Sequence, residues 1–307
     1  MTEADQRDFD WIAIDWGTTN LRAWAMKDGS PVARRTAPVG MAALDRDGFE
    51  PALLAAIGPW LPSSGTVPVV CCGMVGARQG WIEAPYVKTP SPPLDAHAFA
   101  RAPVKDGRIE VTIIHGMSQA SPPDVMRGEE TQIAGLLRLE PGFAGLVCLP
   151  GTHTKWATVE AGRVEQFSSF MTGELYALLA TQSVLRHSLD GESDPEAFAE
   201  AVKEAADDPA QLAAKLFSIR ARGLLEAVAP GRSRGRLSGL LIGLEVAAMR
   251  PQWQGKDVVL VGHGALAESY ARALAIIGGE GRVVDAEQCT LAGLTGAWRM
   301  VEGDRGR

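Results

Sequence analysis

The chain has 307 residues, 46% of them hydrophobic, and a formal net charge of −7. This composition can supply a sizeable core and argues against disorder. The acidic balance argues against a duplex-binding protein, because no large basic region is present to neutralise phosphates. The densest basic run, at 232–236, is expected to be a solvated loop.

Compartment follows from three further features. No apolar run approaches the roughly 18–20 residues that a membrane span needs. Residues 1–10 are polar and acidic, which does not fit a secretory signal. The cysteines lie in or beside apolar stretches and show no C-x-x-C spacing, so we expect buried, reduced thiols in a cytoplasmic protein. They are Cys71, Cys72, Cys148 and Cys289.

The first predicted element is a β-hairpin from Ile12 to Trp24. Apolar residues start the stretch and return after a turn rich in glycine and hydroxyl residues. Such a turn offers unobstructed N–H and O–H donors, which suit a phosphate chain. Asp15, at the end of the first strand, is a candidate Mg²⁺ ligand. An ordinary surface hairpin is the alternative. The candidate phosphate contacts are Gly17, Thr18, Thr19 and Asn20.

The next elements alternate between short strands and helices. The pattern predicts a helix at 49–61, irregular chain at 85–93, and a loop at 117–123; strands are expected at 32–38, 68–72 and 109–115. The loop at 73–81 follows a strand end, where α/β proteins bind ligands. It carries Arg78 and Gln79, and Arg78 could pair with a substrate carboxylate in a bidentate fork. A surface arginine on a flexible loop is the alternative.

Residues 128–137 predict a helix that begins with two acids. Ile133, Leu136 and Leu137 have helical spacing, and Glu129 and Glu130 occupy the first turn. An acidic pair there suits the helix dipole and capping. Alternatively, one carboxylate takes the proton of a hydroxyl that attacks a phosphate.

A second predicted hairpin, at 146–159, repeats the layout of the first. Its glycine lies 134 positions further on (151 − 17), which suggests two similar domains closing on one nucleotide. Pro150 replaces the acid of the first hairpin, so Asp15 remains the Mg²⁺ candidate. Pro141-Gly142 separates the halves, and we expect domains at 1–135 and 136–307. The phosphate candidates here are Gly151, Thr152, His153, Thr154 and Lys155.

The remaining chain predicts helices and one late strand. Thr172 is expected to cap a helix, and Gly239 and Gly243 suggest close helix packing or a hinge. A strand at 258–261 runs into Gly262-His263-Gly264, with Asp285 further on, which formally matches a dinucleotide fingerprint. That interpretation would leave both hairpins without a role. The helices are expected at 175–189, 195–206, 209–228, 237–249 and 291–301.

An ordered set of motifs resembles a known family. Residues 15–22 resemble the first phosphate motif of the sugar kinase, hsp70 and actin superfamily, and residues 150–156 resemble the second. Within that superfamily, residues 72–81, 128–132 and 170–174 are similar to the 2-dehydro-3-deoxygalactonokinase (2-keto-3-deoxygalactonate kinase) family. The resemblance runs from about residue 11 to about residue 298, nearly the whole chain.

The resemblance implies a fold and an activity. The fold would be α/β, with two ribonuclease H-like (actin-like ATPase) domains and an interdomain cleft. The activity would be ATP-dependent phosphorylation of 2-dehydro-3-deoxy-D-galactonate to its 6-phosphate in galactonate catabolism, with ATP and Mg²⁺ as cofactors. The small sugar acid would be the main partner, with no nucleic acid and no membrane; a homo-oligomer stays open.

The resemblance also implies roles for individual residues. In related sugar kinases a Gly-Asp element just before the second phosphate hairpin supplies the base. This chain has two glutamates there, so the resemblance implies that the base is Glu129 or Glu130, with Glu130 as first choice. Substrate contacts would come from Arg22, Arg78, Gln79 and Thr172. Gly262 and Gly264 would let adenine or ribose approach the backbone.

Three alternatives remain open from the sequence. The chain could be a kinase for another small sugar acid, a non-catalytic ATP-binding regulator, or a dinucleotide-dependent dehydrogenase. A coupled ATP assay across keto-deoxy sugar acids separates the first from the expected activity, and NAD binding measured against ATP binding tests the last.

Overall fold

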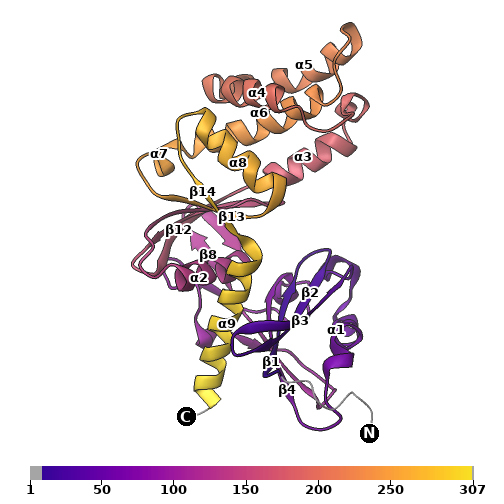
Figure 1. Ribbon diagram of the computed structural model, residues 1–307, viewed down its shortest axis with the longest axis vertical. Helices are drawn as coiled ribbons and strands as arrows, with labels where there is room; N and C mark the ends of the chain where they lie inside the picture. Colours follow the sequence, from indigo (N-terminus) through magenta and orange to yellow (C-terminus); the bar gives the residue numbers. More distant parts are fainter. Residues whose placement is uncertain (1–8, 306–307) are drawn as a thin grey trace. The chain divides into compact units, whose positions relative to one another are not determined.

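The computed structural model describes residues 9–305 of the chain, which divides into two compact units (Figure 1). The first unit contains the chain up to Phe143, residues Glu160–Gln166 and the chain from Ala286 onward. The second contains Ala144–Val159 and Phe167–Asp285. Each unit holds a mixed sheet and helices, so the expected α/β class is confirmed.

The first unit is built on a six-stranded sheet in the order β3-β2-β1-β4-β7-β6. β1 pairs antiparallel with β2 and parallel with β4, and β4 pairs parallel with β7. The predicted first hairpin is therefore present, with Asp15 opposite Arg22 in the register. The strands are β1 (Trp11–Trp16), β2 (Leu21–Lys27), β3 (Ser30–Ala37), β4 (Val67–Gly73), β6 (Ala100–Arg101) and β7 (Ile109–Ile113).

β1 is buried on both of its faces, which explains its nearly continuous apolar sequence. Ile12 and Ile14 join the core cluster that contains Phe49 of α1 (Phe49–Ile57). Trp11, on the opposite face, stacks on Trp298 of α9 (Ala286–Arg305) with ring centroids 5.5 Å apart. The strand that carries Asp15 is thus held by packing on both faces.

The C-terminal helix α9 belongs to the first unit, whereas the sequence interpretation placed residues 136–307 together. Helix α9 packs closely along helix α2 (Glu129–Leu139). A Cβ added at Gly135 would lie 1.7 Å from the Cys289 carbonyl oxygen, so only glycine permits this approach. Glu160–Gln166 also lies with the first unit, where Val164 bridges to Ser91.

A three-stranded sheet completes the first unit, in the order β5-β8-β9. The expected loop at 117–123 is wrong, because most of it forms β8 and the start of β9. The irregular chain expected at 85–93 likewise contains β5. Buried Gly116 and Met117 anchor β8, although Ser118 and Gln119 are polar. The strands are β5 (Tyr86–Lys88), β8 (Gly116–Ala120) and β9 (Pro123–Met126).

The second unit has a five-stranded sheet in the order β12-β11-β10-β13-β14. β10 pairs antiparallel with β11 and parallel with β13, which pairs parallel with β14. The predicted second hairpin is therefore present, between β10 and β11. The strands are β10 (Gly145–Leu149), β11 (Thr154–Glu160), β12 (Arg163–Phe170), β13 (Val258–Gly262) and β14 (Arg282–Asp285).

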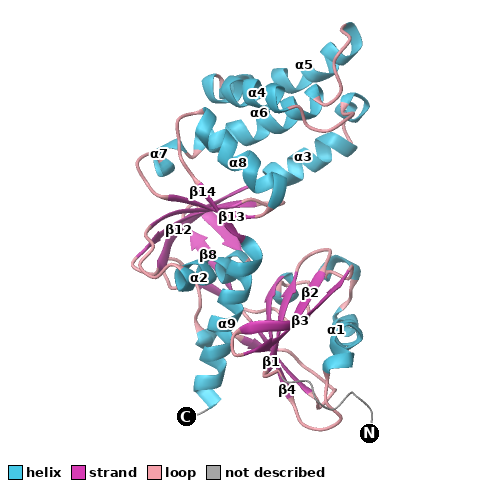
Figure 2. Cartoon of the chain, viewed as in Figure 1, coloured by secondary structure: helices cyan, strands magenta, loops and turns pink. Residues whose placement is uncertain are grey.

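Helices gather on one side of this sheet (Figure 2). Leu146 and Cys148 of β10 share a core cluster with Phe198 of α4, Ile242 of α6 and Tyr270 of α8. The helices are α3 (Thr172–Thr181), α4 (Pro195–Asp207), α5 (Leu212–Leu225), α6 (Arg232–Ala248), α7 (Arg250–Trp253) and α8 (Gly264–Ile276).

Helices α4 and α6 pack unusually closely. A Cβ at Gly239 would lie 2.4 Å from the Phe198 carbonyl oxygen, so the packing interpretation of this glycine is confirmed. The solvated loop expected at 232–236 is wrong. This run forms the first turns of α6, where Arg236 is 5% exposed and pairs with Glu204 of α4 at 2.7 Å.

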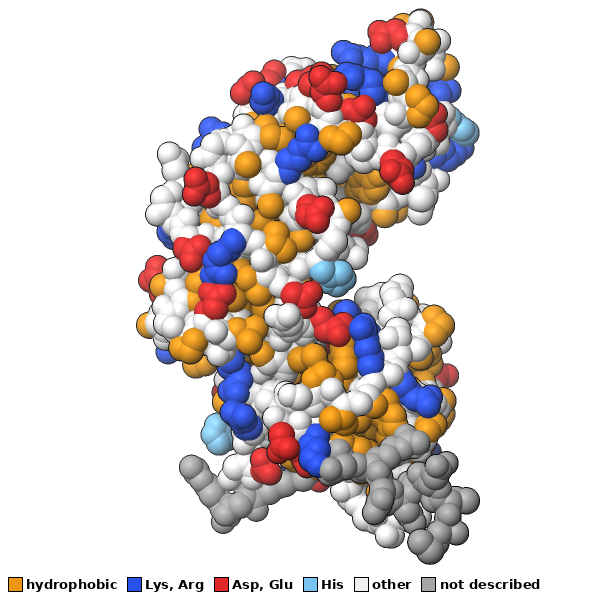
Figure 3. All heavy atoms as spheres, in the orientation of Figure 1, with side chains coloured by type: hydrophobic (Ala, Val, Ile, Leu, Met, Phe, Trp, Pro, Cys, Tyr) orange, Lys and Arg blue, Asp and Glu red, His pale blue; other side chains and the backbone are white. Residues whose placement is uncertain are grey.

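Three further properties complete the description. On the face shown in Figure 3, acidic and basic side chains are interspersed over the surface of both units. Across residues 9–305, none of the helices combines the length and the apolar character that crossing a bilayer requires. All four cysteines are buried, as expected.

Candidate active site

The turn of the first hairpin presents backbone amides in one direction. Gly17 N–H donates to the Asn20 carbonyl at 2.9 Å and closes the turn. The carbonyls of Gly17 and Thr18 each accept from the short helix η1 (Met41–Ala43), at 3.0 Å. Because C=O and N–H of one trans peptide point in opposite directions, the amides of Thr18 and Thr19 point away from η1. Successive amides that point to the same side of a turn can bind an anion.

The side chains of this turn are exposed, as a ligand contact requires. Thr18, Thr19 and Asn20 are all exposed, and Gly17 is half-buried. The Asn20 amide donates to the Thr19 hydroxyl at 3.0 Å. The turn therefore combines oriented amides with accessible hydroxyl groups.

Asp15 lies at the end of β1 and forms an ion pair with Arg22. The Arg22 Nη2 atom is 2.5 Å from the Asp15 Oδ2 atom, and 16% of the Asp15 side chain is exposed. Burial raises the pKa of Asp15 above its ordinary value, although the Arg22 guanidinium acts in the opposite direction. Arg22 is thus placed beside the candidate metal ligand.

The ends of β1 and β4 meet the start of α2. Gly73, with a φ of +91°, closely approaches β1: a Cβ there would lie 2.8 Å from the Trp16 carbonyl oxygen. A Cβ at Gly128 would lie 3.3 Å from the Gly73 Cα atom. The charges of both Asp15 and Glu130 help to raise the pKa of Cys72, after the dominant effect of burial. The structure thus brings the candidate metal ligand and the acidic pair into one region of the first unit.

The two glutamates of α2 differ in environment. Glu130 is 0% exposed, and its carboxylate accepts the Gly128 N–H at 2.7 Å and the Thr131 hydroxyl at 3.0 Å. Burial raises the pKa of Glu130 to about 8, and the neighbouring Glu129 charge adds to this. Glu129 is half-buried and accepts the Arg127 N–H at 3.0 Å. Both glutamates thus accept a backbone N–H at the helix start, and they differ in that Glu130 is fully buried.

Arg78 and Gln79 are both exposed, on the loop that follows β4. Arg46 donates to the Arg78 carbonyl at 3.2 Å, and Trp81 N–H donates to the Val75 carbonyl at 2.9 Å. These bonds fix the backbone of the loop while the Arg78 side chain stays exposed. Arg22, Arg78 and Gln79 all lie in the first unit.

The tip of the second hairpin is tied to the start of α3. The Thr152 carbonyl accepts from Glu174 N–H at 2.9 Å, and His153 Nε2 lies 2.5 Å from the Glu174 carboxylate. Gly151 is half-buried and Thr152 is exposed. By the same peptide geometry, the His153 amide points away from α3. Lys155 is only 5% exposed, so it is not a solvated strand residue.

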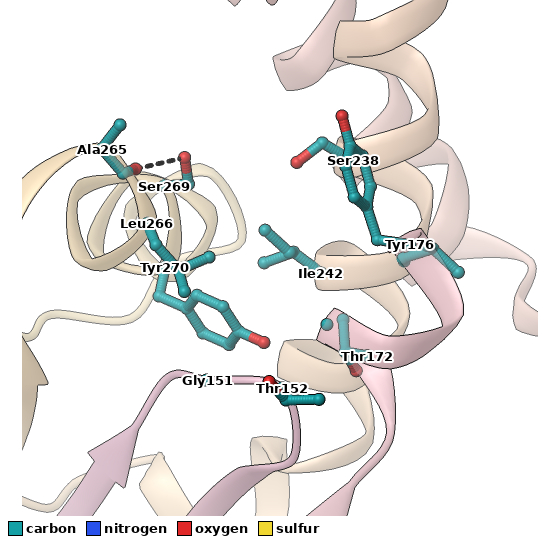
Figure 4. A pocket seen from close by; sticks show the side chains of 12 residues that line it. Gly151, Thr152, Thr172, Tyr176, Ser238, Ile242, Ala265, Leu266, Ser269 and Tyr270 are labelled. Carbon is teal, nitrogen blue, oxygen red and sulfur yellow. Dashed lines mark hydrogen bonds between the residues drawn. The ribbon is translucent and has the colours of Figure 1, made fainter. Parts of the chain in front are cut away.

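A cavity of about 420 Å³ adjoins this second tip, a size in the range of small-ligand pockets. Its walls come from the hairpin and from α3, α6 and α8 (Figure 4). It is lined by Gly151, Thr152, Thr172, Gly173, Tyr176, Ser238, Leu241, Ile242, Ala265, Leu266, Ser269 and Tyr270. Thr172, expected beside the substrate, is 8% exposed and lies on this wall.

Gly262 and Gly264 form the turn that leads into the cavity wall. A Cβ at Gly262 would lie 2.9 Å from the Ala267 Cβ atom, so this glycine permits β13 to meet the first turn of α8. Gly264 begins α8, and the next residues, Ala265 and Leu266, line the cavity. The sequence interpretation missed Tyr176, Ser238, Ile242 and Ser269. Their only signal was helical amphipathicity, which does not separate a pocket wall from a core.

The residues present fit Mg²⁺ in one limited way. Within residues 9–305, no three His, Cys, Asp or Glu side chains are arranged to hold a metal ion. Mg²⁺ often takes only one or two carboxylates and completes its shell with water and substrate phosphates. Asp15, beside the amides of the first turn, can be such a carboxylate.

These features define a class of protein. Both units hold a mixed sheet whose first two strands form a hairpin with glycine and threonine at its tip. One tip has amides that point to the same side, and the other adjoins a cavity. The chain is an α/β protein with two hairpin tips suited to phosphate groups.

Comparison with known proteins gives the family. The sequence model of the 2-keto-3-deoxy-galactonokinase family matches residues 15–297. A Rhizobium meliloti (strain 1021) protein, named as a probable 2-dehydro-3-deoxygalactonokinase, is 40% identical over 303 residues, which are 95% of this chain and 97% of the relative. The 2-dehydro-3-deoxygalactonokinase of Escherichia coli (strain K12) is 33% identical over 288 residues, or 92% and 96% of the two chains. The chain therefore belongs to the 2-keto-3-deoxy-galactonokinase family.

A solved structure agrees with this placement. The crystal structure of a Sinorhizobium meliloti protein, provisionally assigned as a 2-dehydro-3-deoxygalactonokinase, superimposes with a TM-score of 0.86 at 38% identity. The alignment covers 95% of this chain and 99% of that protein. The likeness of fold thus extends over nearly the whole chain.

Proposed function

We propose that this protein transfers the γ-phosphate of ATP to a hydroxyl group of 2-dehydro-3-deoxy-D-galactonate and forms the 6-phosphate, as a step of galactonate catabolism. The observation that carries the proposal is family membership: the kinase family model spans residues 15–297. Both relatives described above are named for this activity. The hairpin tips and the cavity supply places for the phosphates and the nucleoside.

Each of the two units is proposed to be a ribonuclease H-like domain. The support is a shared strand order. In both main sheets the first strand lies between the second and the fourth, and the third strand follows the second. In both, the first strand is antiparallel to the second and parallel to the fourth.

ATP is proposed to bind with its phosphates at the two hairpin tips. Thr18, Thr19 and Thr152 present backbone amides or hydroxyl groups there, and the nucleoside occupies the 420 Å³ cavity beside Gly151. Asp15 would hold Mg²⁺, and the bound ion would supply positive charge against the phosphates. Asn20, His153 and Lys155 border these positions; the Glu174 carboxylate beside His153 holds its ring at the tip.

The sugar acid is proposed to bind in the first unit, where Arg78 and Gln79 are exposed. Arg78 pairs with its carboxylate. We assign the base to Glu129, because Glu130 is 0% exposed and its carboxylate is occupied by the helix start. Glu129 takes the hydroxyl proton, the oxygen attacks the γ-phosphorus, and the bond to the β-phosphate oxygen breaks to release ADP.

A coupled assay of ADP formation tests the activity. The purified protein is supplied with Mg²⁺, ATP and single keto-deoxy sugar acids, with gluconate-type and galactonate-type stereochemistry compared. We expect the highest kcat/KM with 2-dehydro-3-deoxy-D-galactonate. A higher value with another sugar acid would reassign the substrate, and ATP binding without turnover on any of them would indicate a regulator.

Paired variants test the base. Glu129→Gln is expected to lower kcat by about 10²–10⁴-fold, while ATP binding persists. Glu130→Gln keeps the acceptor for the Gly128 N–H and is expected to retain kcat within a few fold. The opposite result would assign the base to Glu130. If both variants keep the kcat of the parent protein, neither glutamate is the base.

A reducing compartment fits the cysteines. All four thiols are buried in the core, which is typical of proteins from a reducing environment. We therefore place the protein in the cytoplasm.

A further inference from the structure

A buried carboxylate on α6 collects three hydrogen bonds near the cavity. Glu245 is 2% exposed. Its Oε1 atom accepts the Trp156 indole N–H at 2.7 Å, and its Oε2 atom accepts the Tyr270 hydroxyl at 2.8 Å. The Thr172 side chain also donates to it. These three donors come from β11, α8 and the first residue of α3, so one side chain joins three elements.

The carboxylate fixes the direction of the hydrogen bonds around it. An ionised carboxylate only accepts, and an indole N–H only donates. Tyr270 has one hydroxyl hydrogen, and it goes to Glu245. The bond of 2.8 Å between Tyr270 and Thr154 must then be donated by Thr154. While Glu245 is ionised, Thr154 therefore has no hydroxyl hydrogen left for a phosphate, although the sequence alone suggested it as a phosphate contact.

The network has almost no access to water. Trp156 and Tyr270 are each 1% exposed, and Thr154 is 0% exposed. Burial raises the pKa of Glu245 to about 7, while the Thr172, Trp156 and Tyr270 bonds lower it. A buried polar group that loses its partner has no water to replace it, so the members depend on one another.

Two members of the network line the cavity. Tyr270 and Thr172 line the cavity together with Gly151 and Thr152 of the hairpin tip (Figure 4). Thr154 follows that tip by two residues, at the start of β11. Glu245 itself is not among the lining residues; it holds the groups that are.

We propose that Glu245 is a positioning residue for the nucleotide: it holds the second hairpin, the start of α3 and α8 in one arrangement around the cavity. This role rests on the proposed function, in which the cavity takes the nucleoside of ATP and the tip takes phosphates. With Glu245 ionised, it leaves Thr152, not Thr154, as the hydroxyl donor of this tip.

Glu245→Gln tests the role by reversing part of the network. The glutamine oxygen can still accept from Trp156, but its NH₂ group then faces Tyr270, which also donates at present. Tyr270 must turn to accept, and the Thr154 hydrogen is displaced. We expect the Kd for ATP, measured by isothermal titration calorimetry, to rise about tenfold, equivalent to the loss of one good hydrogen bond. The KM for the sugar acid should change less than about threefold.

Two further variants separate positioning from general loss of stability. Tyr270→Phe keeps the ring and removes only the hydroxyl, and it should raise the Kd for ATP several-fold. This variant tests the positioning role even if Glu245→Gln fails to fold. Glu204→Gln is the matched control. It weakens the ion pair between Glu204 of α4 and the buried Arg236, which lies on α6 like Glu245 but nearer the start of that helix. This variant should lower the melting temperature and leave the Kd for ATP unchanged.

The outcomes are distinct. Unchanged ATP binding in both Glu245→Gln and Tyr270→Phe would overturn the positioning role alone. Equal weakening in Glu204→Gln would also overturn it, because the effect would then be general destabilisation. A parent protein that does not bind ATP would overturn this role and the proposed function together.

Discussion

Glu130 should make the stability of the folded chain depend on pH, because it is an ionisable group at a fully buried position. Its pKa is raised from 4.5 to about 8, so the folded state holds a proton that the unfolded state releases. The stabilisation is complete below pH 4.5 and is lost as pH rises towards 8. Integrated from pH 5 to pH 8, this amounts to the order of 3 kcal/mol.

Glu130→Gln removes this titration and preserves the acceptor for the Gly128 N–H. The free energy of unfolding, from urea titrations followed by tryptophan fluorescence, is measured at several pH values for parent and variant. Subtracting the free energy of unfolding of the variant from that of the parent at each pH cancels the contribution of other titrating groups, such as Glu245. We expect the parent to lose roughly 3 kcal/mol relative to the variant between pH 5 and pH 8.

A control variant and a clear contrary result accompany this experiment. Glu160→Gln changes an exposed carboxyl in the same way and should leave the difference nearly constant with pH. If the curves of the parent and Glu130→Gln run parallel, Glu130 is not buried as described. The reason for assigning the base to Glu129 would then be lost.

Three further variants probe the packing, the substrate loop and the cavity. Gly239→Ala places a Cβ 2.4 Å from the Phe198 carbonyl oxygen; we expect a loss of about 1–3 kcal/mol in urea unfolding, and a gain in stability would contradict the close packing. Arg78→Ala should raise the KM for the sugar acid about tenfold or more and leave the KM for ATP unchanged; equal effects on both would place Arg78 elsewhere. Ser238→Phe adds a ring to the cavity wall and should weaken ATP binding about tenfold with little change in melting temperature, whereas unchanged binding would show that the nucleoside lies outside the cavity.

The parts of the fold that the sequence predicted depend on neighbours close in the chain. Each hairpin alternates apolar residues around a short glycine and threonine turn, so strand, turn and strand are all visible locally. The helix at 128–137 was equally clear from Ile133, Leu136 and Leu137. The resemblance to a kinase family came from the same local motifs, and the comparisons confirm it.

The parts that the sequence did not predict depend on distant partners. Arg236 looked like part of a solvated basic run, because its partner Glu204 lies 32 residues earlier on another helix. The position of α9 in the first unit depends on Gly135 and Gly293, which permit contact across more than 150 residues of chain. No local pattern reports either contact.

The candidate site also combines features that the local sequence predicts with features that depend on distant contacts. Spacing identified Glu129 and Glu130 as a pair, but only the fold distinguishes the half-buried Glu129 from the fully buried Glu130. The cavity wall combines residues of α3, α6 and α8, and the direction of the Thr154 hydrogen bond follows from Glu245, 91 positions away (245 − 154). These relations exist only in three dimensions.

A crystal structure of the protein with Mg²⁺ and a non-hydrolysable ATP analogue measures the central claim most directly. We expect the nucleoside in the cavity beside Gly151, and phosphate oxygens bonded to amides of both tips, at Thr18 or Thr19 and at Thr152 or His153. A triphosphate bound by one tip alone, with the other more than a hydrogen bond away from every phosphate, would contradict the account.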